Sequence, residues 1–248
     1  MVGSLVGAVA LMAAFIAIEL RSRSPLLPLG FFRKRTPTGA NIIGFGLGTA
    51  IFGMFFLLSL YMQQVLHMSA LKTGVGYLAI ALLAVVGSIA SQALVTKLHV
   101  KPVLSIGLAL LVGGLVYLTR LSPNGSYFGD LFVPFLLLGV GLGFSFVPIS
   151  IAGLAGVGPT EAGLASGLIN TTQQIGGALG LAILATVSSS RTDHLIGKVP
   201  DATALTRGFT LAFWVAAAVA LVALVTTWFV LSGKELETAE PDAVGATG

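Results

Sequence analysis

The chain has 248 residues, of which 56% are apolar and only 9% are charged, and its formal net charge is +4 at pH 7. Soluble domains carry about 25% charged residues, so this composition excludes a water-soluble globular domain. The absence of cysteine excludes disulfides, thiolate metal sites and thiol catalysis. These properties predict an all-α polytopic membrane protein in contact with a lipid bilayer.

Seven apolar runs are long enough to cross a membrane, which takes about 20 mostly apolar residues. In chain order they cover 2–20, 39–62, 72–95, 102–121, 130–156, 162–187 and 208–231. None carries an acidic or basic residue near its middle, and charges or prolines separate the runs. The first run lacks the positive n-region of a signal peptide, so we expect seven retained transmembrane helices.

Basic residues set the expected orientation. Five of the 13 lysines and arginines fall in one segment, namely Arg21, Arg23, Arg33, Lys34 and Arg35. Such a cluster beside a membrane helix predicts a cytoplasmic loop facing anionic headgroups, and not a nucleic-acid site. The N-terminus is then outside and the C-terminus cytoplasmic, in the plasma membrane.

The runs divide the chain into three parts. Residues 1–38 form a linker helix and a basic loop, 39–231 a six-helix domain, and 232–248 a small-residue-rich tail expected to be disordered. The triplets 39–121 and 130–231 start on opposite sides of the membrane, which predicts two inverted three-helix repeats. No residue-level repeat that would prove this relation is evident in the two triplets.

Glycine spacing predicts close helix contacts. Ala40, Gly44 and Gly48 recur every four residues, as do Gly139 with Gly143. Small residues allow helix backbones to approach in lipid, either as sliding contacts of a moving transporter or as ordinary packing. Gly44-x-Gly-x-Gly48 and Gly139-x-Gly-x-Gly143 also resemble fragments of a dinucleotide loop, but no strand precedes them.

A polar segment, Asn170-Thr-Thr-Gln173-Gln174, interrupts run 162–187 near its middle. On a helix, spacings of three and four residues place one set of small and amide residues on a single stripe. The stripe comprises Gly163, Gly167, Asn170, Gln174 and Gly177. We favour a cavity wall or an inter-domain seam. The alternative is an interhelical hydrogen-bond clamp, worth about 0.6–2 kcal/mol per contact.

Aromatic residues beside a proline form a second candidate. Pro148 bends run 130–156, and Phe144, Ser145 and Phe146 precede it. These side chains are candidates to contact an amphipathic aromatic ligand, while lipid-facing phenylalanine is the simpler alternative. The three histidines lie in separate loops and no nucleophile is spaced with a base, so we expect no metal, no cofactor and no enzymatic activity.

Three segments together are similar to a known family. They are Pro25-Leu-Leu-Pro-Leu-Gly-Phe-Phe-Arg-Lys-Arg35, the run Phe55 to Gln64, and Gly163-Leu-Ala-Ser-Gly-Leu-Ile-Asn-Thr-Thr-Gln-Gln-Ile-Gly-Gly-Ala-Leu-Gly180. Over nearly the whole chain, the order of these motifs resembles the fourteen-helix drug:proton antiporters of the major facilitator superfamily. The resemblance makes run 2–20 family helix eight and 39–231 helices nine to fourteen.

The resemblance implies proton-coupled multidrug efflux by alternating access, with a hydrophobic small molecule as substrate. Runs 39–62 and 130–156 would line the central cavity, and runs 72–95 and 162–187 would flank it against a partner domain. In the family's gating loop, Thr96 replaces the usual acid here, while Lys97 and Lys101 remain. The membrane-embedded carboxylates of the family belong mainly to an N-terminal half.

We therefore expect the C-terminal half of an efflux antiporter, as a fragment, a split subunit or a truncated product, inactive without an N-terminal half. The first alternative is a non-transporting membrane subunit or accessory remnant that binds a partner half. The second is a homodimer that forms its own cavity, with a contact through Gly163, Gly167 or Gly177.

Overall fold

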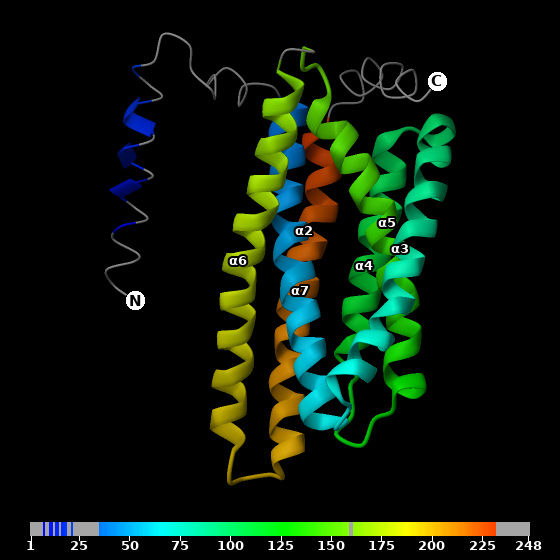
Figure 1. Ribbon diagram of the computed structural model, residues 1–248, viewed down its shortest axis with the longest axis vertical. Coiled ribbons are helices and arrows are strands. Elements are labelled where there is room, and N and C mark those ends of the chain that lie inside the picture. The colour runs from blue at the N-terminus through cyan, green and yellow to red at the C-terminus, as the bar shows by residue number, and fades with distance from the viewer. Residues whose placement is uncertain are drawn as a thin grey trace.

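A computed structural model describes residues 35–158 and 161–231 continuously, together with isolated positions between 7 and 21 that are helical. Most of the expected helix 2–20, the loop 22–34 and the tail 232–248 lie outside the described residues. The described part is a bundle of long helices that run alternately up and down (Figure 1).

Six long helices account for almost all of the continuous part. They are α2 (Arg35–Leu60), α3 (Ala70–Leu98), α4 (Val100–Leu118), α5 (Phe132–Leu154), α6 (Ala162–Leu195) and α7 (Asp201–Val230). Two π-helical segments extend them, η2 (Tyr61–Val65) after α2 and η3 (Tyr127–Leu131) before α5. Each helix coincides with one predicted apolar run, which confirms the all-α membrane fold.

Five of these helices are long and apolar enough to cross a membrane, counting η2 with α2 and η3 with α5. The sixth, α6, has sufficient length but is not among them. It carries the polar segment Asn170 to Gln174 and further serines and threonines toward its C-terminal end. Its position beside α2 and α7 nevertheless makes it part of the same bundle.

The connection between α6 and α7 is shorter than the sequence suggests. The predicted runs end at residue 187 and resume at residue 208, but only 196–200 lies outside the two helices. The Thr192 hydroxyl donates to the Ser188 carbonyl oxygen at 2.9 Å and packs on Gly208 of α7. The Thr192 hydroxyl thus bonds within its own helix and lies against a glycine of α7. The polar residues that suggested a loop therefore continue α6 by two turns.

A repeated Gly-x-Gly-x-Gly relates the two triplets. In α2, Gly44 and Gly48 contact Gln173 of α6, whereas in α5, Gly139 and Gly143 contact α3. The middle glycines turn the other way: Gly46 faces α7, and Gly141 faces α4. The contacts of α2 with α6 and α7 therefore correspond to the contacts of α5 with α3 and α4.

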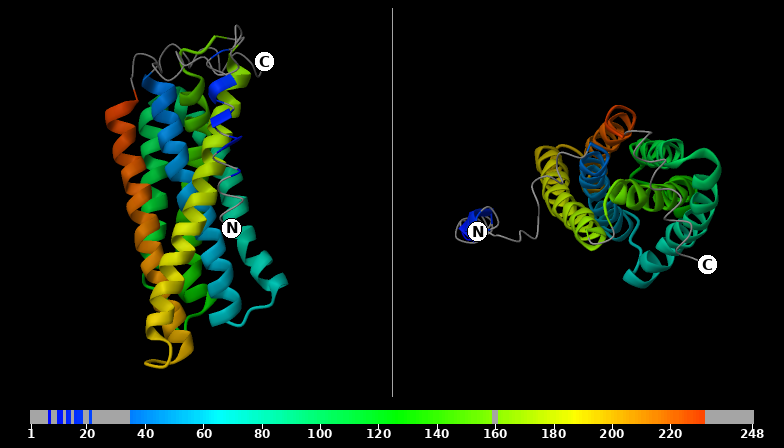
Figure 2. Two further views of the ribbon diagram at one scale, coloured as in Figure 1. Left: turned by 90° about the vertical axis from the view of Figure 1, so that its left-hand side faces the viewer. Right: turned by 90° about the horizontal axis from the view of Figure 1, so that it is seen from above.

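The two triplets also run in opposite senses. In Figure 1, α2 descends from the top of the bundle, whereas α5 ascends from its lower end. Seen from above, α2 and α5 lie centrally, with α6 and α7 on one side and α3 and α4 on the other (Figure 2). This arrangement is an inverted repeat of three helices, and the glycine motif is the residue-level repeat that the sequence analysis did not identify.

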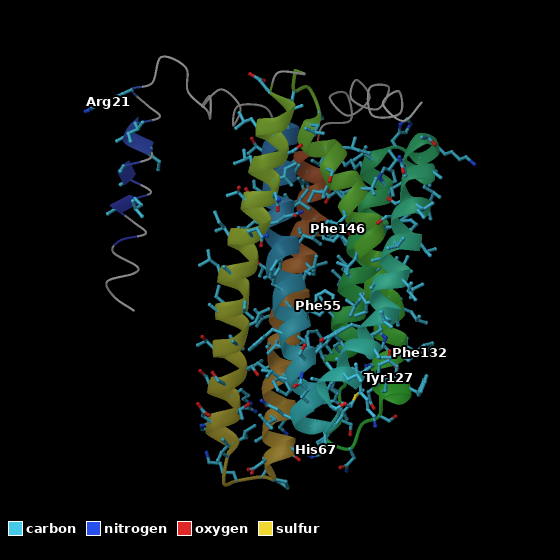
Figure 3. The ribbon with its side chains drawn as sticks, in the orientation of Figure 1. Arg21, Phe55, His67, Tyr127, Phe132 and Phe146 are labelled. Atoms are coloured by element: carbon cyan, nitrogen blue, oxygen red, sulfur yellow. The ribbon has the colours of Figure 1, made fainter. Side chains whose placement is uncertain are left out.

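Aromatic residues link neighbouring helices in the lower part of the bundle. Tyr77 donates its hydroxyl proton to the Phe55 carbonyl oxygen at 2.8 Å, and Tyr127 donates to that of Gly76 at 2.8 Å. The ring of Phe135 stacks on Tyr77 with centroids 5.8 Å apart. Figure 3 marks Phe55 and Tyr127 on the elements that these contacts join. They hold α2, α3 and α5 together at the end away from the polar segment of α6.

Candidate functional site

The predicted stripe on α6 lies mostly on an open surface. Gly163, Gly167, Asn170 and Gln174 are all exposed. A β-carbon added at Gly163 or Gly167 would meet no atom within 4 Å. Amide side chains and bare helix backbone are costly to expose to lipid, so direct contact of this surface with lipid is unfavourable.

Gly177 departs from the stripe. It is buried, and a β-carbon there would lie 2.8 Å from the ring of Phe52 on α2. Gly177 lies at the edge of the stripe that is nearest α2. Because α6 crosses α2 at this point, α2 covers that edge. Gly177 therefore serves helix packing, while the four residues before it remain uncovered by the described part of the chain.

The polar segment also contains an interhelical clamp, formed by residues outside the stripe. Thr172 donates to the Asn41 side-chain oxygen at 2.9 Å, and Asn41 donates to the Pro37 carbonyl oxygen at 2.9 Å. Further along, the Thr49 hydroxyl donates to the Gly176 carbonyl oxygen at 2.9 Å. The clamp weighed from the sequence is thus present in α6, on a different face from the open stripe.

A small cleft lies between α6 and α5, next to the stripe. It has a volume of about 190 Å³ and is lined by Phe146, Ser150, Ser166, Ile169, Asn170 and Gln173. Figure 3 marks Phe146 in the upper half of the bundle. The structure therefore brings three predicted site residues together, namely Phe146, Asn170 and Gln173. The lining offers hydroxyls, amides and one aromatic ring without any ionisable group.

The other two residues of the Phe144-Ser145-Phe146 candidate lie elsewhere. Ser145 is fully buried, and its hydroxyl donates to the Gly141 carbonyl oxygen at 2.7 Å. Phe144 is partly buried and packs against the core, with its backbone against Gly107 of α4. Only Phe146, which is 41% exposed, is available to a ligand from the open surface.

The two lysines of the expected gating loop have different surroundings. Lys97 is exposed in the last turn of α3. Lys101 donates from Nζ to the carbonyl oxygens of Trp228 at 2.7 Å and Leu231 at 3.3 Å, at the C-terminal end of α7. The side chain of Lys101 thus binds a helix end within this bundle.

Three residues of the cleft were not expected from the sequence, namely Ser150, Ser166 and Ile169. Ser150 follows Pro148, and Ser166 stands between Gly163 and Gly167. Their positions beside already selected residues were the available signal. A serine alone in a helix usually bonds to its own backbone, as the Ser150 hydroxyl does to the Phe146 carbonyl oxygen at 2.8 Å, so a lone serine does not by itself indicate a site.

Comparison with known proteins identifies the family of the chain. Residues 2–181 match the family model described as Major Facilitator Superfamily. The chain belongs to the major facilitator superfamily. The matching relatives include transporters named for drug resistance and export, which agrees with the resemblance inferred from the three sequence motifs.

Three such relatives illustrate the match. The puromycin resistance protein of Streptomyces alboniger is 32% identical over 253 residues, which cover 98% of this chain and 50% of the relative. The cephamycin export protein of Amycolatopsis lactamdurans is 35% identical, covering 76% of this chain and 39% of the relative. The multidrug transporter protein MdtP of Bacillus subtilis is 27% identical, covering 74% and 34%. The chain thus spans half or less of the length of these superfamily relatives, which it matches in about their C-terminal half.

Proposed function

We propose that this chain is the C-terminal half of a proton-coupled multidrug efflux antiporter that works by alternating access with an N-terminal half. The observation that carries the proposal is the open stripe of Gly163, Gly167, Asn170 and Gln174 on α6. Such a surface suits a seam between two halves or the wall of a water-filled cavity, because lipid satisfies neither amides nor bare backbone.

The cleft beside the stripe supports a substrate-contacting role. Phe146 supplies an apolar ring, while Asn170 and Gln173 supply hydrogen-bonding groups. Its volume of about 190 Å³ is below that of a typical ligand pocket, so it would form only part of a site completed by the other half. The named relatives include puromycin resistance and multidrug transport proteins, which supports a hydrophobic small molecule as substrate.

Proton coupling is assigned to the N-terminal half. Within the described helices, acidic residues occur only near the ends, including Asp130, Asp193 and Asp201. A carboxylate that binds a translocated proton lies within the membrane and faces the bundle interior. We therefore expect the chain to be inactive alone.

The orientation is a proposal as well. Arg35, Lys97 and Lys101 lie at the end of the bundle where α2 begins, and basic loops favour the cytoplasm. We accordingly place this end in the cytoplasm and the end with His67 outside, in the plasma membrane.

Reconstitution tests the proposal. The chain would be incorporated into liposomes alone, and also joined to the N-terminal half of the Streptomyces alboniger puromycin resistance protein. With an imposed proton gradient, we expect puromycin transport by the joined protein and none by the chain alone.

Two results would contradict the proposal in different ways. Proton-driven transport by the chain alone would remove the need for a partner half. Stable association of the two halves without any transport would favour the alternative, a non-transporting membrane subunit that binds a partner half.

A further inference from the structure

Two cationic side chains are held at the C-terminal end of α7. Arg35, at the start of α2, donates from Nη2 to the Phe229 carbonyl oxygen. Lys101, in the first turn of α4, donates from Nζ to the carbonyl oxygens of Trp228 and Leu231. Since Trp228 and Phe229 are consecutive residues, both positive charges lie against the same turn of α7.

The helix end balances only part of this charge. A helix C-terminus carries about half a negative charge, whereas Arg35 and Lys101 each carry a full positive one. Neither forms an ion pair with an acidic residue in the described part of the chain. A lysine has three N–H donors and an arginine five, so both keep donors beyond the bonds to α7. The cluster thus has surplus positive charge and donors that remain available to an anion.

Two exposed aromatic rings accompany the charges. The side chains of Trp228 and Phe229 are 57% and 71% exposed. Lys101 Nζ lies 5.1 Å from the centre of the Trp228 ring, so the charge and the ring form one surface. The Trp228 indole N–H has no acceptor among the described residues. Tryptophan is enriched where a membrane meets water, because its body is apolar and its N–H is polar.

The cluster lies where three helices reach the boundary of their apolar segments. The membrane-length segments of α2 and α4 begin at Arg35 and Val100, and that of α7 ends at Val230. Seen from above, α7 lies at the outer edge of the bundle (Figure 2). None of the cluster residues lines the cleft beside Asn170. The charges therefore face the membrane surface on the outside of the bundle.

An anionic phospholipid fits this combination of groups. Its phosphodiester accepts hydrogen bonds from guanidinium and ammonium groups, and basic pockets between transmembrane helices bind such headgroups. Leu221 and Val225 stand seven and three residues before Trp228, on the same helix face, and both are exposed to receive an acyl chain. A free anion would use the charges alone and leave the aromatic and apolar surface unused.

We propose that Arg35, Lys101 and Trp228 form a binding site for one anionic phospholipid at the end of α7. The phosphate lies against the two cationic side chains, and an acyl chain packs along Val225 and Leu221. Because Arg35 begins α2 and Lys101 begins α4, the headgroup connects both helices to α7. This site goes beyond the proposed transport function and does not depend on it.

Tryptophan fluorescence tests the site in the full chain. The sequence contains two tryptophans, so Trp214→Phe leaves Trp228 as the only reporter. This reporter protein would be placed in phosphatidylcholine vesicles that contain equal amounts of either brominated phosphatidylglycerol or brominated phosphatidylcholine, and the quenching compared. We expect phosphatidylglycerol to be preferred by about fivefold or more, from the surplus charge at the membrane surface.

Removing one charge from the cluster should reduce this preference. In the reporter protein, Arg35→Gln should lower it by about threefold or more. Lys97→Gln is the matched control, because it removes the same charge from the same end of the bundle but from a lysine that is exposed in the last turn of α3. The control should keep the preference of the reporter protein. Size-exclusion chromatography and circular dichroism would establish that each variant is folded.

Two measurements on the reporter protein keep the outcome decisive if Arg35→Gln folds poorly. High salt should reduce the preference for phosphatidylglycerol, because it screens exposed charges. Inorganic phosphate at constant ionic strength should leave the quenching unchanged, because it lacks the acyl chains that pack on α7.

Equal quenching by the two brominated lipids would overturn the proposal. Lys97→Gln reducing the preference as much as Arg35→Gln would also overturn it, because general surface charge would then attract the lipid. Displacement by inorganic phosphate would assign the cluster to a free anion instead. A preference that emerges only after Glu235→Gln and Glu237→Gln would show that the chain's own acidic tail occupies the cluster, and the lipid proposal would fail.

Discussion

Lys101 and Trp228 join α4 to the end of α7 through two interactions at once. Lys101 Nζ donates to the Trp228 carbonyl oxygen at 2.7 Å and lies 5.1 Å from the centre of the Trp228 ring. A cation at a helix C-terminus also balances the partial negative charge of the terminal carbonyl groups. The lysine expected from the family's gating loop thus has a structural role inside this domain.

Replacing that lysine should destabilise the domain. We expect Lys101→Met to lower the free energy of unfolding by about 1–2 kcal/mol, from the lost helix-end charge and the lost cation–π contact. Lys97→Met is the matched control, since Lys97 is exposed in the last turn of α3, and its effect should stay within about 0.5 kcal/mol. Denaturant titration in detergent measures both. Equal stability of the two variants would return Lys101 to a purely gating role.

The repeated glycines should be equally intolerant of a methyl group. A β-carbon at Gly48 would overlap the Gln173 carbonyl oxygen, and one at Gly143 would lie 2.5 Å from that of Ala84. Backbone atoms cannot rotate away, so we expect Gly48→Ala and Gly143→Ala each to cost about 1–3 kcal/mol of stability.

Gly113→Ala in α4 is the control for these two variants. No atom lies within 4 Å of a β-carbon added there, so the change should be neutral or stabilising by up to about 1 kcal/mol. The same unfolding titration applies. A tolerated alanine at either repeat position would mean that α2 or α5 does not pack as closely as its equivalent.

The clamp between α2 and α6 should be measurable by a double-mutant cycle. We expect Asn41→Leu and Thr172→Val to show a coupling free energy of about 0.6 kcal/mol, the average for such hydrogen bonds in membrane proteins. Thr171 is the control partner because its hydroxyl bonds to the Gly167 carbonyl oxygen in its own helix, at 2.8 Å. Coupling between Asn41 and Thr171 as large as that with Thr172 would show that the cycle reports general perturbation of α6.

The open stripe should matter for transport and not for insertion. In the joined protein described above, Asn170→Leu and Gln174→Leu should each reduce puromycin export, because both side chains lie on the surface proposed to meet substrate or the other half. Membrane insertion and expression should stay normal. Thr226→Leu, at a partly exposed position on α7, provides a polar-to-apolar change away from the stripe. Export that is unchanged in both α6 variants would leave the stripe with a packing role only.

Helix positions were predictable from the sequence because they depend on local composition. Each long helix of the continuous part coincides with a predicted apolar run, and Pro148 inside α5 did not end that helix. The end of α6 was predicted wrongly, near residue 187 instead of Leu195. Serine and threonine side chains can also bond to the backbone in non-helical conformations. The helical conformation is favoured here by the contact of Thr192 with Gly208 of α7.

The candidate site was predictable only in part. Helical spacing placed Asn170 and Gln174 on one face, and both are exposed there. The same spacing included Gly177, which Phe52 covers, and the neighbouring motif included Ser145, which is buried. Sequence spacing gives the angle of a residue around its own helix but not the neighbour that stands at that angle.

The sequence by itself determined that this chain is a membrane protein of the major facilitator superfamily with an inverted pair of three-helix units. The length of an apolar run and a family motif are properties of contiguous residues, so both can be recognised from the sequence alone. Only the tertiary structure decided that Thr172 clamps α2 while Asn170 stays open, and that Arg35 and Lys101 both bind the end of α7. Those assignments depend on how the helices cross, and crossing is set by glycine contacts between residues far apart in the chain.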